Sequence, residues 1–560
     1  MLYNCEMFGT FFALKALIPG NKKSNPRINL GYENLLNNNY LYNIRKAIES
    51  VCEFEYKRAN NQSSKNYLLN LSKLDLAFYI AQRNTSYLLT SFTFNRAIAN
   101  YYSGNISLVF PLNKEWQQIF KEHEIKSNKY LCLILWRIYI LSSIFRNLLM
   151  FVKQCKAKKS KHVVKTTEPV NCDSFSNIYF YDISSRNLPS QNGLEFEKNI
   201  VTWYKKNVLL GNPINVLHNV KDQYMVNEAH KDFKFSYYRT LFFNDNFYIN
   251  IRTLIWYIAA ILKKINHLKM SVNLLLILTE MINAKKTYDL HGELNLTALV
   301  FNNSIGSIKP LWAVVLEKQK VRLDYCFYAC YSEPLDIESN YPIDGFWKLA
   351  RWNNYYVVDK YQSEQLFLQV IHKPLNIYKD VIPWWSDANI EISEYADNSI
   401  ALFDTVLPNN LYTLGTLNQF GWYKVEIAKK YLLTALETAA ELDLIVFYKL
   451  KRIREGKYRN SEHWNYINDL LIQFKKNVIQ IDDRVAPERI IKNTAISISK
   501  PLSTTAIIAK QMEKSSVYLD PTMGVLKIDP ALRGIELVYG KNDLKEFVQN
   551  VFNYKSLKYK

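Results

Sequence analysis

Glycine and proline are scarce in this chain, which has 15 glycines and 16 prolines among its 560 residues. Ordinary usage is about 7% for glycine and about 5% for proline. The scarcity excludes a collagen-like sequence and argues against long glycine-rich or proline-rich linkers. It also leaves no glycine-rich loop for phosphate, because neither a G-x-G-x-x-G dinucleotide fingerprint nor a P-loop is present.

Other motifs with a known chemistry are absent too. The chain has no D-x-D pair, which weakens the case for a metal-dependent nucleotide-sugar site of the single-Rossmann type. It has no H-E-x-x-H zinc motif, no serine nucleophile elbow and no nucleic-acid module of known spacing. We therefore expect no bound metal ion and no resident cofactor.

Cysteine is present but forms no recognisable framework. The count is seven, and no C-x-x-C pair occurs. An odd number without framework spacing predicts free thiols in a reducing compartment. Residues 1–12 carry no basic segment of the kind that opens a signal peptide. The expected location is therefore the cytoplasm.

The charge balance is the unusual positive feature. Lysine and arginine number 71 against 51 acidic residues, which gives a formal net charge of +20. Such an excess suits nucleic acid, an anionic membrane surface or phosphorylated ligands, and the charge alone does not choose among them. The hydrophobic share of 48% is that of a globular chain. The length predicts about three or four domains.

Two apolar stretches point toward a membrane surface. Residues 131–152 carry Arg137 and Arg146, and residues 254–278 are interrupted by three lysines and a histidine. A spanning helix needs about 20 mostly uncharged residues, so we expect both stretches to lie in the interface instead. A run of lysines at positions 153–165 follows the first stretch and would attract anionic lipid. The alternative is a buried helix pair with a solvated lysine tail.

The order of helical and strand-like patterns along the chain predicts four regions. Residues 1–170 form a largely helical region that holds the first apolar stretch, and residues 171–290 form a second helical region. From about residue 295, apolar strand-like runs alternate with helical segments, which is typical of βαβ units and a parallel sheet. The alternation restarts near residue 390. We expect two tandem Rossmann-like α/β domains facing a cleft, 291–388 on the acceptor side and 389–560 on the donor side.

Ligands of such sheets bind beyond the carboxyl ends of the strands, so the residues that end strands are the site candidates. The sharpest segment is a buried strand followed by Pro501 and by three hydroxyls that open a helix, Ser503, Thr504 and Thr505. A helix amino terminus with spare hydroxyls favours an anion such as phosphate. Ordinary helix capping is the alternative.

Charged residues end other strands. Lys449, Lys451 and Arg452 follow a buried strand and could neutralise a departing phosphate, unless they belong to an exposed basic loop. Asp404 ends the first strand of the second block and is a candidate general base or a turn cap. The remaining cleft candidates stand near strand or turn ends and are Asp520, Glu333 and His372.

These segments together resemble the bacterial polysaccharide-biosynthesis family named for its P-F-T-S motif. Its pattern runs I-S-x-P-F-T-S-T-A, then Y-Y-D-P-T-G, then R-G-I, with F-D, L-K-x-K-R and D-E-Y-Q elements upstream. The matching residues here are Pro501-Leu502-Ser503-Thr504-Thr505-Ala506, Tyr518-Leu519-Asp520-Pro521-Thr522, Arg533-Gly534-Ile535, Phe403-Asp404, Lys449 to Arg452, and Asp359-Lys360-Tyr361-Gln362. The name motif departs from the pattern because leucine replaces phenylalanine and serine-threonine replaces threonine-serine.

The resemblance covers roughly residues 295–550 and implies a two-Rossmann, GT-B-like glycosyltransferase of surface polysaccharide assembly. It implies a nucleotide-sugar donor, CMP-linked by analogy at the level of the fold. Lys449, Lys451 and Arg452 would neutralise the donor phosphate, which Ser503, Thr504 and Thr505 would bind. The expected acceptor is a growing or lipid-linked glycan, at the inner face of the cytoplasmic membrane. The alternatives are a nucleotide-sugar epimerase or hydrolase on the same fold, and a basic nucleic-acid-binding protein.

Overall fold

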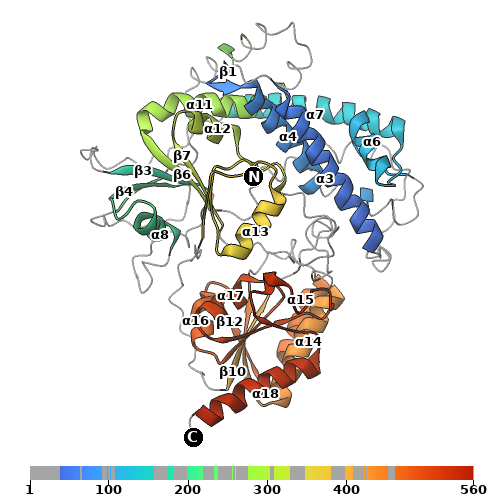
Figure 1. The fold of residues 1–560 in the computed structure, drawn as a ribbon, viewed down its shortest axis with the longest axis vertical. Coiled ribbons are helices and arrows are strands. Elements are labelled where there is room, and N and C mark those ends of the chain that lie inside the picture. The colour runs from blue at the N-terminus through green and yellow to red at the C-terminus, as the bar shows by residue number, and fades with distance from the viewer. Residues whose placement is uncertain are drawn as a thin grey trace.

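The computed structural model describes a large part of the chain in two α/β domains and a helical unit (Figure 1). The described residues are 38–62, 66–90, 97–98, 101, 107–156, 175–181, 183, 199–218, 233–237, 255–256, 259, 275–302, 308–327, 329, 347–379, 398–405, 407, 422, 425–451 and 461–558. Most of the second apolar stretch, 254–278, lies outside them.

The carboxyl-terminal domain is built on a six-stranded parallel sheet with the order β12-β11-β10-β13-β14-β15. Counted along the chain this order is 3-2-1-4-5-6, which is the order of nucleotide-binding Rossmann domains. The strands are β10 (Ser399–Asp404), β11 (Ile445–Leu450), β12 (Val478–Ile481), β13 (Ile496–Ser499), β14 (Ser515–Leu519) and β15 (Glu536–Val538).

Helices cover both faces of this sheet because successive strand residues point to opposite sides. On one face, Val446 and Tyr448 pack with α14 (Val425–Glu441), α15 (Ser461–Gln473) and α18 (Lys541–Lys558). On the other face, Ala401 and Phe447 pack with α16 (Pro487–Lys492) and α17 (Thr504–Gln511). All six residues of β10 are buried, as expected of a central parallel strand.

The preceding domain has a seven-stranded parallel sheet with the order β5-β4-β3-β6-β7-β8-β9. Its strands are β3 (Ser176–Tyr181), β4 (Ile214–His218), β5 (Phe233–Tyr237), β6 (Leu296–Asn302), β7 (Arg322–Cys326), β8 (Asn354–Tyr356) and β9 (Asn376–Tyr378). The first six follow the same 3-2-1-4-5-6 order. The expected pair of Rossmann-like domains is therefore confirmed. The helices of this domain are α8 (Ile200–Asn207), α11 (Leu278–Leu294), α12 (Leu311–Lys318) and α13 (Lys360–Gln369).

The prediction of a helical region at 171–290 is wrong. Strands β3, β4 and β5 lie in that region and form one half of the first sheet, so the domain starts near residue 176 and not near 291. Short apolar runs cannot be assigned to strand or helix by periodicity alone, which explains the error. The boundary between the two domains falls between β9 and β10, where the expected position 388/389 lies outside the described residues.

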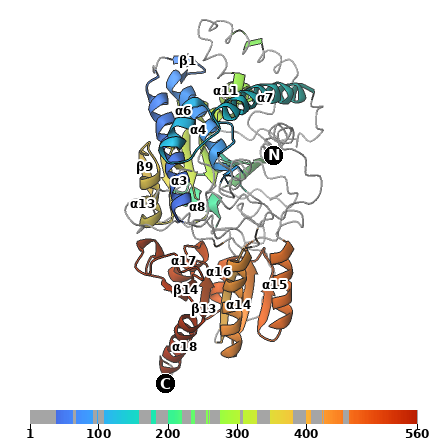
Figure 2. The ribbon, with the colours of Figure 1, turned by 90° about the vertical axis from the view of Figure 1, so that its right-hand side faces the viewer.

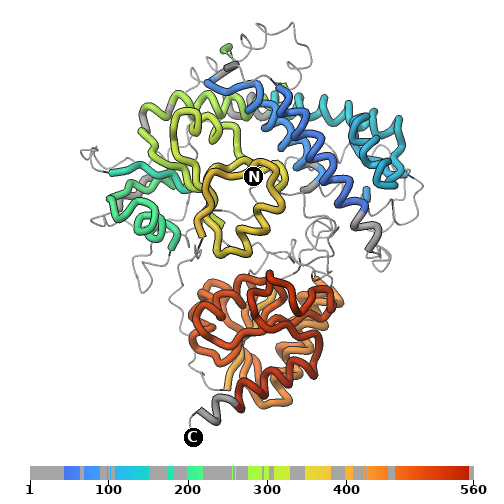
Figure 3. Tube along the Cα trace, viewed as in Figure 1, coloured from blue at the N-terminus to red at the C-terminus, as the bar shows by residue number. Residues whose placement is uncertain are grey.

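A helical unit precedes the first domain, as expected. It comprises α3 (Asn38–Asn60), α4 (Lys73–Thr90), α6 (Lys114–Glu122) and α7 (Lys129–Lys156), with the two-stranded ladder of β1 (Asn66–Leu68) and β2 (Leu71–Ser72) between α3 and α4. In Figure 1 these helices lie beside the first sheet, with α7 at the top of the view and α3 running down toward the carboxyl-terminal domain. Figure 3 shows the same arrangement along the backbone trace.

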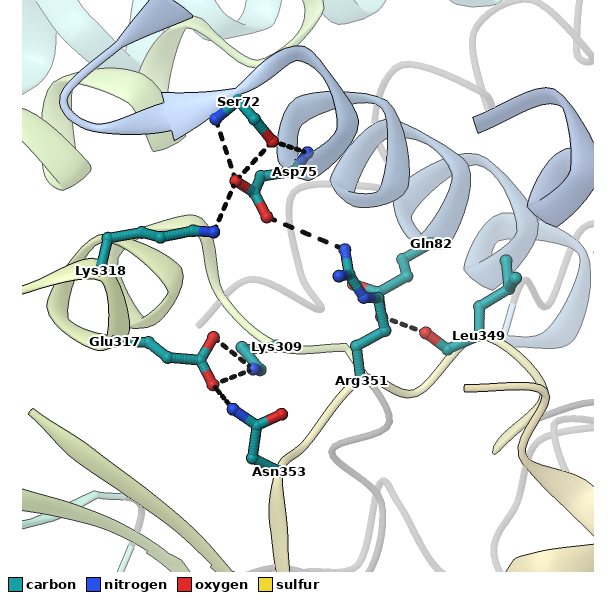
Figure 4. Close-up of polar contacts among 9 residues, drawn as sticks. All are labelled: Ser72, Asp75, Gln82, Lys309, Glu317, Lys318, Leu349, Arg351 and Asn353. Carbon is teal, nitrogen blue, oxygen red and sulfur yellow. Dashed lines mark hydrogen bonds and ion pairs between the residues drawn. The ribbon is translucent and has the colours of Figure 1, made fainter. Parts of the chain in front are cut away.

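The helical unit joins the first domain through a polar junction around Asp75 (Figure 4). Ser72 and Asp75 cap the start of α4 reciprocally, since the Asp75 carboxylate accepts from the Ser72 amide and hydroxyl. The same carboxylate pairs with Lys318 at 3.1 Å and with Arg351 at 3.9 Å. Beside it, Glu317 pairs with Lys309 at 2.8 Å. Burial would raise the pKa of Asp75, but the Ser72 hydrogen bonds and the Lys318 charge outweigh it and lower the pKa.

We expect Asp75→Asn to lower the free energy of unfolding by about 1–3 kcal/mol at pH 7, because it leaves two cations without their carboxylate. Because folding lowers the pKa of Asp75, its carboxylate stabilises the folded protein at pH values above the unfolded-state pKa of 3.8. This contribution is lost as the pH falls further, through the folded-state pKa. Urea unfolding from pH 7 downward measures it. The control is Asp289→Asn, which removes an exposed pair with Lys285 on α11 and should cost little. Equal stabilities at pH 7 would contradict the proposed junction.

Candidate functional site

The carboxyl edge of the second sheet holds the candidate site, at the point where the strand order reverses. Strands β10 and β13 are neighbours there, and the chain leaves them in opposite directions along the sheet. A crevice outside the carboxyl ends of such a pair is the usual ligand position in open α/β sheets. Asp404 ends β10, while Lys500 and the start of α17 follow β13.

Asp404 and Lys500 form a buried ion pair across this point. The Lys500 Nζ lies 2.6 Å from Asp404 Oδ1, and the Asp404 side chain is fully buried. Tyr448 donates its hydroxyl to Asp404 Oδ2 at 3.3 Å, and the Lys500 ammonium stands 5.2 Å from the centre of the Tyr431 ring. A carboxylate held in this way positions the lysine. Asp404 is thus engaged with Lys500 and Tyr448, and its role as a general base stays a prediction.

Three further buried groups surround the ion pair. Burial raises the pKa of Tyr431 and of Tyr448, and the negative charge of Asp404 raises both further, so the phenols remain protonated donors. Tyr431 donates to the carbonyl of Phe403 at 2.9 Å. Burial lowers the pKa of His463 on α15 to about 4, so its ring is neutral at pH 7. This shell fixes the ammonium of Lys500 in one place.

The hydroxyls at the start of α17 contact one another in the segment that includes Lys500. Ser499 Oγ lies 2.8 Å from Thr505 Oγ1, and Ser503 Oγ lies 3.2 Å from the same atom. Ser503 occupies the N-cap position, yet its side chain makes no capping hydrogen bond. The hydroxyls are therefore grouped with one another instead of closing the helix start. A helix amino terminus without a side-chain cap is suited to an anion.

A strained turn sets this geometry. The Ser503 amide donates to the Lys500 carbonyl at 3.3 Å, with Pro501 and Leu502 as the central residues, and Leu502 has φ of 59°. Proline followed by a positive φ describes a type II turn, which normally takes glycine at its second position. Leucine in this conformation costs about 1–3 kcal/mol. Burial offsets the cost, because Leu502 packs into an apolar cluster that also contains Val358 of the first domain.

Lys449 and Lys451, two of the basic residues expected at the end of β11, differ in burial and in their hydrogen bonds. Lys449 is buried, and its ammonium donates to the Asp483 carbonyl at 2.8 Å and to the Leu450 carbonyl at 3.3 Å. It is thus engaged by the backbone, which contradicts its expected role at phosphate. Lys451 has an exposed side chain, and its amide donates to the Asp404 carbonyl at 2.8 Å, which places it next to the site. Arg452 lies outside the described residues.

Asp520 organises a loop instead of facing a ligand. Its buried carboxylate accepts from the Trp422 indole at 3.0 Å, from the Thr522 hydroxyl at 2.6 Å and from the amides of Gly524 and Val525 at 3.0 and 3.2 Å. Each oxygen therefore has several donors from the segment that follows β14. Asp520 directly follows the carboxyl end of β14, and its place in a ligand cleft stays a prediction, while its carboxylate is hydrogen-bonded within the fold.

His372 lies far from this edge. It follows α13 and precedes β9, at the amino ends of the first-sheet strands, which is the edge opposite to the strand ends where ligands bind. Its pKa is lowered by burial and by the charges of Arg351 and Lys309, which belong to the Asp75 junction. The expectation that His372 faces the cleft is therefore wrong. Glu333, the other such candidate, lies outside the described residues.

The two domains meet through a second ion pair, between Asp359 and Arg533. Asp359 caps α13 by accepting from the Gln362 amide at 2.9 Å, and Gln362 returns a bond by accepting from the Val358 amide at 2.8 Å. The guanidinium of Arg533 grips the same carboxylate with two donors, one of them at 3.0 Å from Asp359 Oδ1. The side chain of Arg533 is 5% exposed and that of Asp359 is 19% exposed, so both are largely buried.

Arg533 is held on several sides. It follows η7 (Pro530–Leu532) with φ of 59°, and its Nη1 donates to the Ala531 carbonyl at 2.7 Å. Its guanidinium stands 5.4 Å from the Tyr361 ring. Two segments that resemble separate family elements, D-x-Y-Q and R-G-I, therefore bind each other across the domain junction. Neither element predicts this contact, because the partners are 174 residues apart.

The chain was compared with protein-family models, curated proteins and solved structures. A family model described as "Polysaccharide biosynthesis PFTS motif protein" matches residues 256–548. No curated protein matches. Among solved structures, a sucrose-phosphate synthase from Thermosynechococcus elongatus is 11% identical, with a TM-score of 0.36 over 68% of this chain and 90% of that one.

Two other solved structures are equally remote. Anabaena HepE in complex with UDP-glucose is 10% identical, with a TM-score of 0.37 over 68% of this chain and 90% of that one. A UDP-GlcNAc 2-epimerase from Neisseria meningitidis bound to UDP-GlcNAc is 11% identical, with a TM-score of 0.32 over 68% of this chain and 93% of that one. At such scores the fold assignment rests on the strand orders described above.

The Asp359–Arg533 pair should be energetically coupled. We expect Asp359→Asn and Arg533→Gln to show a coupling energy of about 1–2 kcal/mol in a double-mutant cycle of urea unfolding. Each single variant should also widen the distribution of domain orientations seen by small-angle X-ray scattering, because a bidentate tie between the domains is lost.

The matched control for this cycle is the exposed pair of Lys527 and Asp543, which lie 3.6 Å apart within the second domain. Its two charge-removing variants should be additive and should leave the scattering curve unchanged. Additive effects and an unchanged curve for the Asp359 and Arg533 variants as well would show that the pair does not hold the domains together.

Proposed function

This chain belongs to the polysaccharide biosynthesis PFTS motif family, and we propose that it is a glycosyltransferase that takes its sugar from a nucleotide-activated donor. The observation that carries the proposal is the start of α17, which has no side-chain cap and follows Lys500 at the switch point of a Rossmann-like sheet. That position is where sheets of this order bind phosphorylated ligands.

In this proposal the donor phosphate lies against the first turn of α17. The amides of that turn and the positive end of the helix dipole attract the phosphate. The hydroxyls of Ser503 and Thr505 stand within hydrogen-bonding distance of each other and can turn to donate to phosphate oxygens. Lys500 supplies a full positive charge that Asp404 keeps in place.

The same groups would act on the leaving group. When the glycosidic bond to the donor phosphate breaks, negative charge grows on the phosphate oxygen that leaves with the nucleotide. A fixed ammonium and fixed helix amides stabilise that charge without rearranging, which lowers the barrier. Fixed positive charge then does what a divalent metal ion does in other transferases, so the proposed mechanism is metal-independent. Lys451, whose amide donates to the Asp404 carbonyl, has an exposed side chain, and we assign it to the outer side of the same ligand.

The identity of the donor nucleotide and of the acceptor is inferred from the resemblance of the motifs. A CMP-linked donor follows by analogy with metal-free enzymes that hold acidic sugars with a basic strand end and a hydroxyl-bearing helix start. The acceptor that suits a polysaccharide biosynthesis family is a growing surface glycan or its lipid-linked precursor. An epimerase or hydrolase at the same site would convert the nucleotide sugar with no acceptor present, whereas a transferase needs the acceptor.

We expect Lys500→Ala to weaken nucleotide-sugar binding roughly 10- to 100-fold, because a charge-assisted contact to phosphate is lost. Thermal shift against CMP-, UDP- and GDP-sugars identifies the donor, and titration of that donor measures the loss. Lys500→Arg should retain part of the affinity. Lys492→Ala is the control, since Lys492 is an exposed lysine at the end of α16 in the same domain.

Two results would reject the proposal at different levels. Stabilisation by no nucleotide sugar would reject the transferase itself. Stabilisation that survives Lys500→Ala and Thr505→Val would leave the class standing and reject the site. Release of free nucleotide at the same rate with and without a glycan acceptor would favour the hydrolase.

A further inference from the structure

Helix α7 has one face that belongs to the protein core. Cys132 and Leu135 are buried there, and Trp136 packs on Trp116 with ring centres 5.3 Å apart. Asn147 is buried as well, and its side-chain amide donates to the Leu276 carbonyl at 2.6 Å. These contacts fix α7 along its length against α6, α11 and the segment before α11.

The opposite face of α7 is apolar and exposed. Its large side chains recur every three or four residues, so they form one stripe along the helix. About 19 residues at 1.5 Å each make the stripe close to 29 Å long. Two of its members are Leu141 and Phe145, with 67% and 63% of their surface exposed. The whole stripe consists of Tyr130, Leu131, Ile134, Ile138, Leu141, Phe145, Leu148 and Leu149.

The charges of α7 are all of one sign. The helix contains no aspartate and no glutamate, and its five charged residues are Lys129, Arg137, Arg146, Lys153 and Lys156. Arg137 is exposed and stands three residues after Ile134 and four before Leu141, which places it at the edge of the stripe. An apolar stripe with a cation at its edge, on a helix without acidic residues, matches a surface of anionic headgroups over acyl chains.

Among the described residues, one helical segment, Lys129–Leu149, is long and apolar enough to cross a membrane. The buried face argues against crossing. Ser143 and Asn147 are buried polar residues of α7, and the Asn147 contact ties the helix to the backbone before α11. Pulling α7 into the bilayer core would break these contacts and place both arginines in hydrocarbon, which is costly.

We propose that α7 lies flat in the interface of an anionic lipid bilayer, with its exposed stripe at the boundary of headgroups and acyl chains. The helix remains packed on the protein through its other face. In Figures 1 and 2, α7 lies on the part of the molecule away from the carboxyl-terminal domain. The switch-point site of that domain therefore stays open to soluble ligands while the protein is docked. The proposal stands whether or not the protein is a transferase.

The test is flotation of the full chain with vesicles of phosphatidylcholine, with and without phosphatidylglycerol. We expect binding to the anionic vesicles, and at least a tenfold loss of bound fraction for the double variant Leu141→Glu with Phe145→Glu. Leu210→Glu is the matched control, because Leu210 is 86% exposed and lies on a turn after α8. It should bind like the parent protein. Unchanged melting temperatures show that the variants are folded.

The charge component is tested separately. Arg137→Glu should lower binding to anionic vesicles roughly tenfold and should leave binding to phosphatidylcholine alone unchanged. Alkaline carbonate should release the docked protein, since it lies in the interface. Resistance to carbonate would overturn the flat orientation in favour of crossing. Unimpaired flotation of the double variant would also overturn the proposal. A third result would overturn it as well: a parent protein that does not bind vesicles and forms a dimer, and a double variant that is monomeric. The stripe would then contact a second copy of the chain.

Discussion

The ion pair between Asp404 and Lys500 joins the two strands at which the second sheet changes direction. A buried carboxylate and a mostly buried ammonium are stable together and costly apart, since the loss of either leaves an uncompensated charge. Tyr431, Tyr448 and His463 enclose the pair. The pair therefore holds Lys500 in place in the loop that leads from β13 into α17, and the proposed chemistry of the domain uses that loop.

The second domain could be predicted closely from the sequence, and the first only in part. Strands β10 to β14 are apolar runs that alternate with helices, so the pattern predicts a parallel α/β sheet here. Strands β3 to β5 are separated from the rest of their sheet by long connections and carry polar residues such as Asn177 and Lys234. Local pattern cannot reveal that they pair with β6, because pairing is decided by the tertiary fold.

The same limit applies to the site. Ser503 and Thr505 are close in the chain at the start of α17, so their grouping was predictable. The partnership of Asp404 with Lys500 was not, because it joins residues that only the strand order brings together. Lys449 shows a finer limit. Neighbouring strand residues point to opposite faces, and its place between Tyr448 and Leu450 directs it away from the helices that those two residues contact. A buried lysine in that position serves the fold.

The turn that carries Leu502 has a consequence for how the two domains communicate. Its side chain shares one apolar cluster with Val358 of the neighbouring domain, while its backbone shapes the loop between Lys500 and the helix start. A residue held at positive φ by its packing is sensitive to any loosening of that packing. Rotation of one domain against the other would thus relax the loop and disperse its hydroxyls. The leucine acts as a mechanical link, which makes the affinity for an anion at one strand end a readout of interdomain geometry.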